Sequence, residues 1–131
     1  MDPTAIILVA VGGGVGAVLR YFVSLWEHPF SATTFPFATV LVNVAGCAAI
    51  GLMAAVLLGP LSHLREPVRL AIIVGVLGGF TTFSTFALEA IELLDAGRIG
   101  QALTYILLSN ALGLLAAWAL FRIGTTLLSS D

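Results

Sequence analysis

Residues 78–86, GGFTTFSTF, lie inside a long apolar segment, yet they do not have the composition of an ordinary membrane-spanning helix. Two adjacent glycines, each costing about 1 kcal/mol relative to alanine, and the β-branched and hydroxyl residues that follow weaken an α-helix. A broken helix in a bilayer leaves backbone N–H and C=O groups unpaired at a cost of several kcal/mol each. Such a break persists only against protein, an ion or a water-filled cavity. We therefore predict a break at residues 78–82, sheltered by the rest of the chain.

The composition indicates that this break lies within a membrane protein. With 60% hydrophobic and 9% charged residues, the 131-residue chain is too apolar for a soluble domain and is predicted to be an all-α integral protein of the cell membrane. A spanning helix needs about 20 apolar residues, so the chain accommodates one four-helix transmembrane domain over residues 1–131. The net charge of −2, without a basic stripe, sets nucleic acid aside as a partner. The expected spans are residues 5–26, 37–58, 68–94 (with the break) and 99–128.

Several single residues within the spans carry expectations of their own. Gly12 and Gly16 form a small-x-x-x-small pattern, which predicts close packing of two helix backbones. Arg20, near the end of the first span, is expected to reach the membrane interface or to pair with a carboxylate. The amide of Asn43 needs hydrogen-bond partners at membrane depth, either as a link between helices or as a pore lining. Cys47 is the only cysteine, which excludes an intrachain disulfide, and we interpret it as a small buried hydrophobe.

The distribution of positive charge leaves the orientation open. The expected connections are residues 27–36, where His28 is interpreted as solvated, 61–67 and 95–98. Membrane orientation follows the asymmetry of Lys and Arg near the span ends, and a chain without a clear asymmetry can insert both ways and form an antiparallel dimer. A fixed topology set by distance-weighted charges is the alternative. One side of the membrane would collect Arg65, Arg69 and Arg122, and the other Arg20 and Arg98.

These motifs together identify a resemblance. The sequence resembles the Fluc/CrcB family of microbial fluoride channels over nearly its whole length. The GG-x-TTFSTF run together with the asparagine-bearing second span makes this a specific match. The features that carry it are residues 12–20 (GGGVGAVLR), 39–46 (TVLVNVAG), 75–86 (GVLGGFTTFSTF) and the polar face of the fourth span.

The resemblance implies a dual-topology homodimer with two parallel ion pathways and a structural sodium ion at its centre. In the family pattern, backbone carbonyls at the break hold this cation, and they correspond here to Gly78 and Thr81 of each subunit. Carbonyl oxygens are suitable ligands for a hard cation. Gly113 departs from the pattern, because the polar track would continue there with a hydroxyl.

The same resemblance assigns roles to polar and aromatic side chains. Arg20, Thr39 and Glu89 are expected to be structural or to lie at a pore mouth, and Glu89 either pairs with Arg20 or faces that mouth. The residues implied to line the pore or contact fluoride are Asn43, Phe83, Ser84, Thr85, Phe86, Tyr105 and Ser109.

The chemistry of these groups suits a small, strongly hydrated anion. A fluoride pore must replace water with hydrogen-bond donors and still release the ion, and amides and hydroxyls are neutral donors. Phe83 and Phe86, three positions apart, also present electropositive ring edges, although an aromatic packing stripe is the alternative on spacing alone. Phe80 is assigned to packing.

Two other functions are weighed against a passive channel. A proton-coupled exporter of small ions or cations needs an acidic residue deep in a span, and Glu89 is the only candidate. An enzyme needs a nucleophile with a base or a metal-ligand cluster. Both histidines lie in expected loops, and no HExxH or GxSxG pattern occurs, so we do not expect enzymatic activity.

Overall fold

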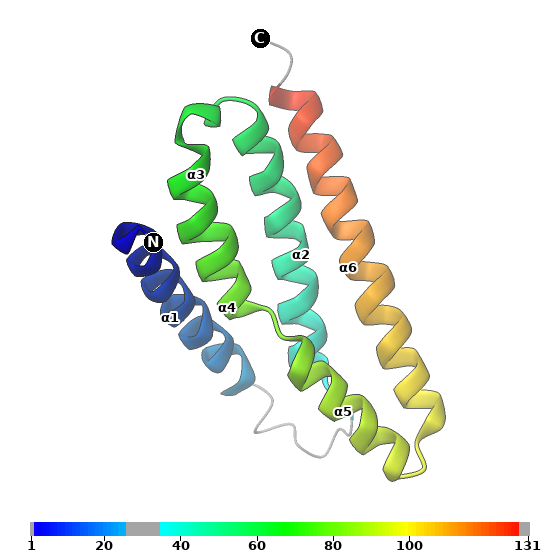
Figure 1. Cartoon of the computed structure of the whole chain (residues 1–131). Coiled ribbons are helices and arrows are strands. Elements are labelled where there is room, and N and C mark those ends of the chain that lie inside the picture. The colour runs from blue at the N-terminus through cyan, green and yellow to red at the C-terminus, as the bar shows by residue number, and fades with distance from the viewer. Residues whose placement is uncertain (1, 26–34, 129–131) are drawn as a thin grey trace.

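The structure is a computed structural model that describes residues 2–25 and 35–128. Within these residues all regular secondary structure is helical, and four helical segments are long and apolar enough to cross a membrane (Figure 1). This confirms the prediction of an all-α membrane protein with four spans. Most of the first predicted connection, including His28, lies outside the described residues. The four segments are Pro3–Leu25, Phe37–Leu58, Ser62–Asp95 and Ile99–Leu128.

The first, second and fourth segments are continuous helices, whereas the third is made of several helical pieces. The continuous ones are α1 (Pro3–Leu25), α2 (Phe37–Leu58) and α6 (Ile99–Leu128). The third segment begins with a 3₁₀ turn, η2 (Ser62–Leu64), and continues through α3 (Arg65–Val68), the π-helix η3 (Arg69–Leu77), α4 (Gly78–Phe80) and, after a gap, α5 (Phe83–Asp95).

The expectation of a loop over residues 61–67 was therefore wrong for most of that stretch. Pro67 is compatible with the helix because it lies in the first turn of α3, where a backbone N–H has no intrahelical partner to lose. Glu66 and Arg69 form an exposed ion pair of 2.9 Å one turn apart. The turn at residues 95–98 is present as expected, and Gly97 adopts a φ of 73° there.

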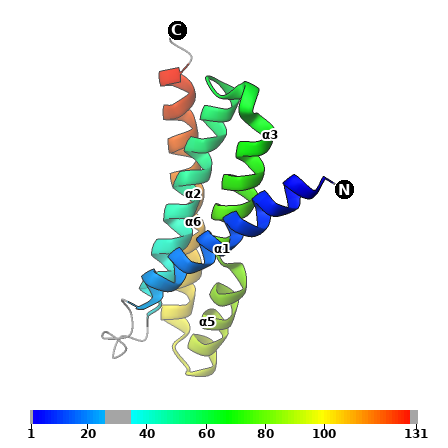
Figure 2. The same cartoon turned by 90° about the vertical axis from the view of Figure 1, so that its left-hand side faces the viewer.

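The helices form two pairs that meet at the third segment. α2 and α6 pack side by side along most of their length, whereas α1 packs on η3 and α4, and α5 packs on α6. Figure 2 shows α1 crossing the other helices at an angle. The start of α1, the α2–α3 turn and the end of α6 lie toward one end of the molecule, and the α5–α6 turn lies at the other (Figure 1).

Glycines bring the backbones of α1 and the third segment into direct contact. A Cβ on Gly12 would collide with the carbonyl oxygen of Ala71, and one on Gly16 with the carbonyl oxygen of Val76. From the other side, a Cβ on Gly75 would lie 2.9 Å from the Cα of Gly12. The predicted close packing through Gly12 and Gly16 is confirmed, and its partner is the third segment.

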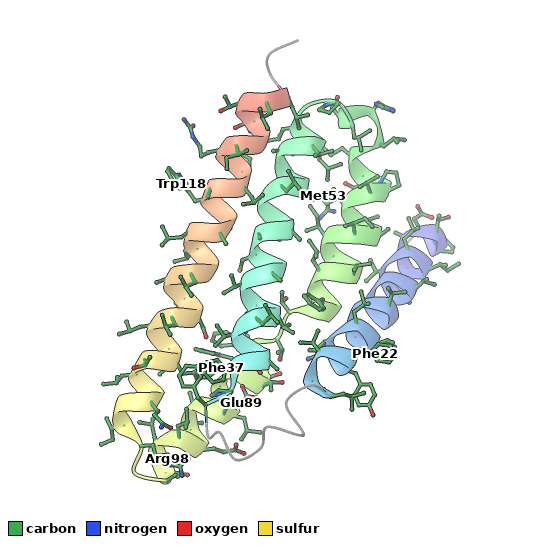
Figure 3. The ribbon with its side chains drawn as sticks, turned by 180° about the vertical axis from the view of Figure 1, so that it is seen from behind. Phe22, Phe37, Met53, Glu89, Arg98 and Trp118 are labelled. Carbon is green, nitrogen blue, oxygen red and sulfur yellow. The ribbon has the colours of Figure 1, made fainter. Side chains whose placement is uncertain are left out.

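Large apolar side chains cover the outside of the bundle. Trp118 is 65% exposed and Phe22 58% exposed, and both point away from the other helices (Figure 3). Such exposure suits contact with lipid, because acyl chains are as apolar as the side chains themselves. The buried cluster is correspondingly small, and it lies between α5 and α6 around Ala90, Leu93, Ala102 and Tyr105.

The glycine contacts predict how the first span tolerates alanine. At residue 16 the added methyl group would meet backbone atoms of Val76 and Phe80, which cannot rotate away. We expect Gly16→Ala to lower the free energy of unfolding by about 1–3 kcal/mol through overpacking. Denaturant unfolding of the purified protein in detergent measures this change.

The matched control is Gly14→Ala in the same helix. A Cβ on Gly14 meets nothing within 4 Å, and alanine favours the helix by about 1 kcal/mol. Equal stability of the two alanine variants would contradict the packing argument.

Candidate functional site

The third segment leaves helical geometry at two threonines. Thr81 has φ −73° and ψ 158°, and Thr82 has φ −147° and ψ 117°, so both are extended between the end of α4 and the start of α5. The predicted interruption is present, but its expected cause was wrong in part. Gly78 and Gly79 are helical, and Gly79 serves close packing, because a Cβ there would collide with the carbonyl oxygen of Gly13.

Asn43 on α2 pairs with both backbone groups of Thr82. Its Oδ1 accepts a hydrogen bond from the Thr82 N–H at 2.9 Å, and its Nδ2 donates to the Thr82 carbonyl oxygen at 3.1 Å. One side chain thereby satisfies a donor and an acceptor that the interruption removes from the helical ladder. The two roles left open for Asn43 are resolved in part, since it links the second and third spans.

Thr82 also starts the next helix. Its Oγ1 accepts a hydrogen bond from the Thr85 N–H at 3.1 Å, which is an N-cap, and it donates to Thr85 Oγ1 at 2.9 Å. Before the break, Thr81 N–H and Oγ1 both donate to the Leu77 carbonyl, at 3.0 and 2.9 Å. The ends of the two half-helices are thus closed by local hydrogen bonds.

This pattern deprives two backbone carbonyls of their helical donors. In a continuous α-helix, the N–H of Thr82 would bond to the carbonyl of Gly78, and the N–H of Thr85 to that of Thr81. Here these N–H groups bond to Asn43 Oδ1 and Thr82 Oγ1 instead. Gly78 and Thr81 are the two residues whose carbonyls the sequence resemblance assigned to a cation. Their oxygens fit a hard cation, which prefers carbonyl ligands.

A second polar cluster surrounds Glu89 on α5. Its Oε1 accepts a hydrogen bond from Thr39 Oγ1 at 3.0 Å, and its Oε2 accepts one from the Tyr105 hydroxyl at 2.7 Å. Both donors are buried, Thr39 on α2 and Tyr105 on α6. The carboxylate therefore joins three helices, and Figure 3 shows it near the start of α2.

Two hollows flank the interruption, each with a volume of about 340 Å³. The first, which we call the Asn43 groove, is lined by Asn43, Gly46, Cys47, Ile50, Ile73, Leu77, Gly78, Thr81, Thr82, Phe83, Phe86, Ser109, Asn110, Gly113 and Leu114. The second, the Glu89 cavity, is lined by Ala17, Arg20, Tyr21, Ser24, Ala38, Thr39, Val42, Thr82, Thr85 and Glu89. Thr82 is common to both, so the interruption lies between them.

The structure gathers most of the predicted site residues around these hollows. Arg20, Thr39, Thr85 and Glu89 line the Glu89 cavity, whereas Tyr105 is buried and reaches the cluster through its hydroxyl. The predicted residues that line the Asn43 groove are Asn43, Gly78, Thr81, Phe83, Phe86 and Ser109. Ser84 is exposed at the start of α5 and is absent from the lining of both hollows.

Aromatic rings form one side of the groove. The ring centroids of Phe83 and Phe86 lie 5.7 Å apart, and those of Phe86 and Tyr105 lie 5.1 Å apart. Phe83 is 79% exposed in the single chain, so it does not pack in a core of this subunit. The arrangement gives Phe83 a free surface beside the groove, which the alternative of an intrachain packing stripe does not explain.

Sequence reasoning missed two residues of this site. Thr82 carries the N-cap and borders both hollows, and its position before a hydroxyl-containing helix start was an available signal. Cys47 was interpreted as buried, whereas it is partly exposed and lines the Asn43 groove. No sequence pattern distinguishes these two settings of a cysteine, because its exposure depends on the facing helix.

The two hydrogen bonds between Asn43 and Thr82 predict that Asn43→Asp, which replaces the amide nitrogen by oxygen, destabilises the protein. In Asn43→Asp, one oxygen still accepts from the Thr82 N–H, but the other opposes the Thr82 carbonyl oxygen. We expect a loss of about 1–3 kcal/mol in unfolding free energy and exchange of the Thr82 amide hydrogen that is faster by about ten-fold or more. Denaturant unfolding and hydrogen–deuterium exchange measure these effects.

Asn110→Asp is the matched control for this substitution. The Asn110 Nδ2 donates within its own helix to the Ile106 carbonyl at 2.7 Å and does not bond to the break. If both aspartate variants left Thr82 exchange unchanged, the pairing between α2 and the interruption would be refuted.

Comparison with known proteins places these features in a family. The family model described as CrcB-like protein, Camphor Resistance (CrcB), matches residues 7–121. A fluoride-specific ion channel FluC of Agrobacterium fabrum is 40% identical over 122 residues, covering 93% of this chain and 97% of that protein. Proteins of the same name from Rhizobium meliloti (44% over 114 residues; 87% and 90% covered) and Chloroflexus aurantiacus (42% over 111 residues; 85% and 87% covered) are also similar.

Proposed function

Because this chain belongs to the CrcB family, we propose that it is a fluoride-specific ion channel, through which fluoride leaves the cell passively across the cell membrane. The relatives are named fluoride-specific ion channels, and the four apolar helices fit a multi-pass membrane protein. The observation that carries the proposal is the interruption at Thr82. It lies between two hollows whose largely apolar walls each carry several polar side chains, within a segment where a membrane helix is ordinarily continuous.

The polar groups around the interruption suit passage of fluoride rather than tight binding. The hydroxyls of Thr85 and Ser109 and the second Nδ2–H of Asn43 are neutral and can donate hydrogen bonds in place of water. The Thr82 hydroxyl already donates to Thr85 Oγ1. A permeating ion must be held well enough to enter and weakly enough to leave. Neutral donors meet both conditions, whereas a buried full positive charge at the break would retain the anion.

The phenylalanines contribute in a second way. Fluoride that moves along the groove meets Phe83 and Phe86, whose ring edges are electropositive. Their planes are inclined at 38° to one another, so the rings do not stack face to face. Edge contacts stabilise an anion without a fixed charge and without the cost of desolvating a cation.

A second copy of the chain, inserted in the opposite orientation, would complete the site. The Asn43 groove opens on a face where Gly78 and Phe83 are exposed. The nearly even distribution of arginines between the two ends permits insertion both ways. Two antiparallel copies meeting at this face would cover the groove of each and enclose two ion pathways related by a two-fold axis.

The same dimer would hold the sodium ion. Gly78 and Thr81 have carbonyls whose helical N–H donors are diverted to side chains. Two such carbonyls from each copy, brought together at the two-fold axis, would supply oxygen ligands for a small hard cation. Bound there, the ion would neutralise the partial negative charge of the carbonyls and hold the two interruptions together.

Fluoride release from liposomes tests the proposed channel. We expect reconstituted protein to release fluoride in the presence of valinomycin and potassium, and to release chloride at least about a hundred-fold more slowly, because chloride is larger and needs a wider site. Ion-selective electrodes measure both. Equal rates for the two anions would refute the assignment, and full fluoride release without valinomycin would indicate electroneutral proton coupling, the alternative for this chain.

The antiparallel dimer can be tested by changing the number of arginines on each side of the membrane. Ser62→Arg adds a positive charge at the α2–α3 turn. A triple variant, Arg65→Gln, Arg69→Gln and Ala96→Arg, moves the excess of positive charge to the opposite side of the membrane. All four residues lie near span ends. We expect each variant alone to insert in one orientation and to lose at least about ten-fold in fluoride flux, since an antiparallel dimer needs both orientations. Co-expression should restore flux. Full flux from either variant alone would argue against dual topology.

A further inference from the structure

The further inference concerns the end of the Asn43 groove where Cys47 on α2 faces Gly113 on α6. A Cβ on Gly113 would lie 3.2 Å from Cys47 Sγ and 3.8 Å from Cys47 Cβ. The absence of a side chain at residue 113 therefore leaves room for the thiol. Cys47 is partly exposed, and both residues line the groove.

A neighbouring buried hydroxyl indicates that this part of the groove can bind a polar molecule or an ion. Ser109, one turn before Gly113 on α6, is only 8% exposed and lines the same groove. Its Oγ has no hydrogen-bond partner within residues 2–25 and 35–128. A buried hydroxyl left unsatisfied costs about 1–3 kcal/mol, so its place in the groove favours water or an anion as a partner.

We propose that Cys47 Sγ borders the ion route next to Ser109 and is a modification site at which small thiol-reactive electrophiles block conduction. This inference rests on the proposed channel function. The thiol is on the wall of a hollow whose other polar side chains are Asn43, Thr81, Thr82, Ser109 and Asn110. A group added to the sulfur can lie either beside Gly113 or in the groove itself. In both positions it narrows the proposed ion route.

The reaction is ordinary thiol chemistry. Cys47 loses its proton to water, and the thiolate sulfur attacks the sulfenyl sulfur of methyl methanethiosulfonate. A new S–S bond to the –SCH₃ group forms, the bond between sulfenyl and sulfonyl sulfur breaks, and methanesulfinate leaves. Only the thiolate reacts, and a thiol surrounded by apolar groups stays protonated. The modification rate therefore reports whether water reaches Cys47.

The experiment treats the reconstituted protein with methyl methanethiosulfonate and follows mass and fluoride flux together. We expect one –SCH₃ adduct per chain, a fall in flux of at least about ten-fold, and recovery of flux when dithiothreitol removes the adduct. Cys47→Ala should show the same fluoride flux before and after treatment, whatever its flux relative to the unsubstituted protein. Gly113→Ala should slow the modification, because its methyl group takes the space beside the sulfur.

A cysteine on the outer face of α6 provides the matched control. Leu107 is 67% exposed and does not line the groove. In the Cys47→Ala background, Leu107→Cys should keep full flux after treatment, which excludes a general effect of labelling.

Each other result has a definite meaning. If Cys47 reacts only after denaturation, or if it reacts in the membrane without lowering flux, the inference is refuted while fluoride conduction stands. If the untreated protein releases no fluoride, the channel function fails, and the mass measurement alone still decides whether water reaches the thiol.

Discussion

The paired hydrogen bonds between the Asn43 side chain and the Thr82 backbone are the interaction on which the rest of the site depends. Lipid offers no substitute for a lost helical hydrogen bond, so an extended residue at membrane depth needs a donor and an acceptor at the same place. A primary amide supplies both. The geometry requires α2 to approach closely, and Gly46 permits it, because a Cβ there would collide with Thr81 Cγ2. The amide, the glycine and the interruption are therefore one structural unit.

The two halves of the interrupted segment are held in different ways. Before the break, η3 and α4 lie against α1 through backbone contacts at Gly12, Gly16 and Gly79, where no side chain intervenes. After it, α5 packs on α6 through the cluster around Tyr105, and Glu89 ties it by hydrogen bonds to α2 and α6. Rigid contacts on both sides keep the ends of the half-helices at fixed positions. The polar groups between them are thus preorganised, which in the proposed channel would lower the cost of replacing the water around an ion.

Hydropathy and composition predicted the number and approximate bounds of the spans, because a membrane helix needs a long apolar run whatever its partners. They also predicted the interruption within residues 78–82, where the threonines are extended as the β-branched residues suggested but the glycines are helical. Gly78 and Gly79 have low helix propensity, yet both are helical, and Gly79 packs directly on Gly13 of α1, an example of tertiary contacts overriding propensity. Of the two alternatives for Asn43, the link between helices is confirmed, and the pore lining stays a prediction for a residue that lines the Asn43 groove. The Glu89 cluster and the Cys47 environment depend on the facing helices, which no local pattern specifies.

The position of Glu89 raises an electrostatic question for an anion pathway, because a carboxylate near fluoride is repulsive. Its two oxygens accept hydrogen bonds from Thr39 and Tyr105, which spread its negative charge onto two hydroxyl groups that are themselves fixed by burial. Arg20 lines the same cavity and adds a positive charge at its wall. A cavity with both signs of charge attracts ions less strongly than one with a lone cation. In the proposed channel, fluoride that entered this cavity would therefore not be trapped there.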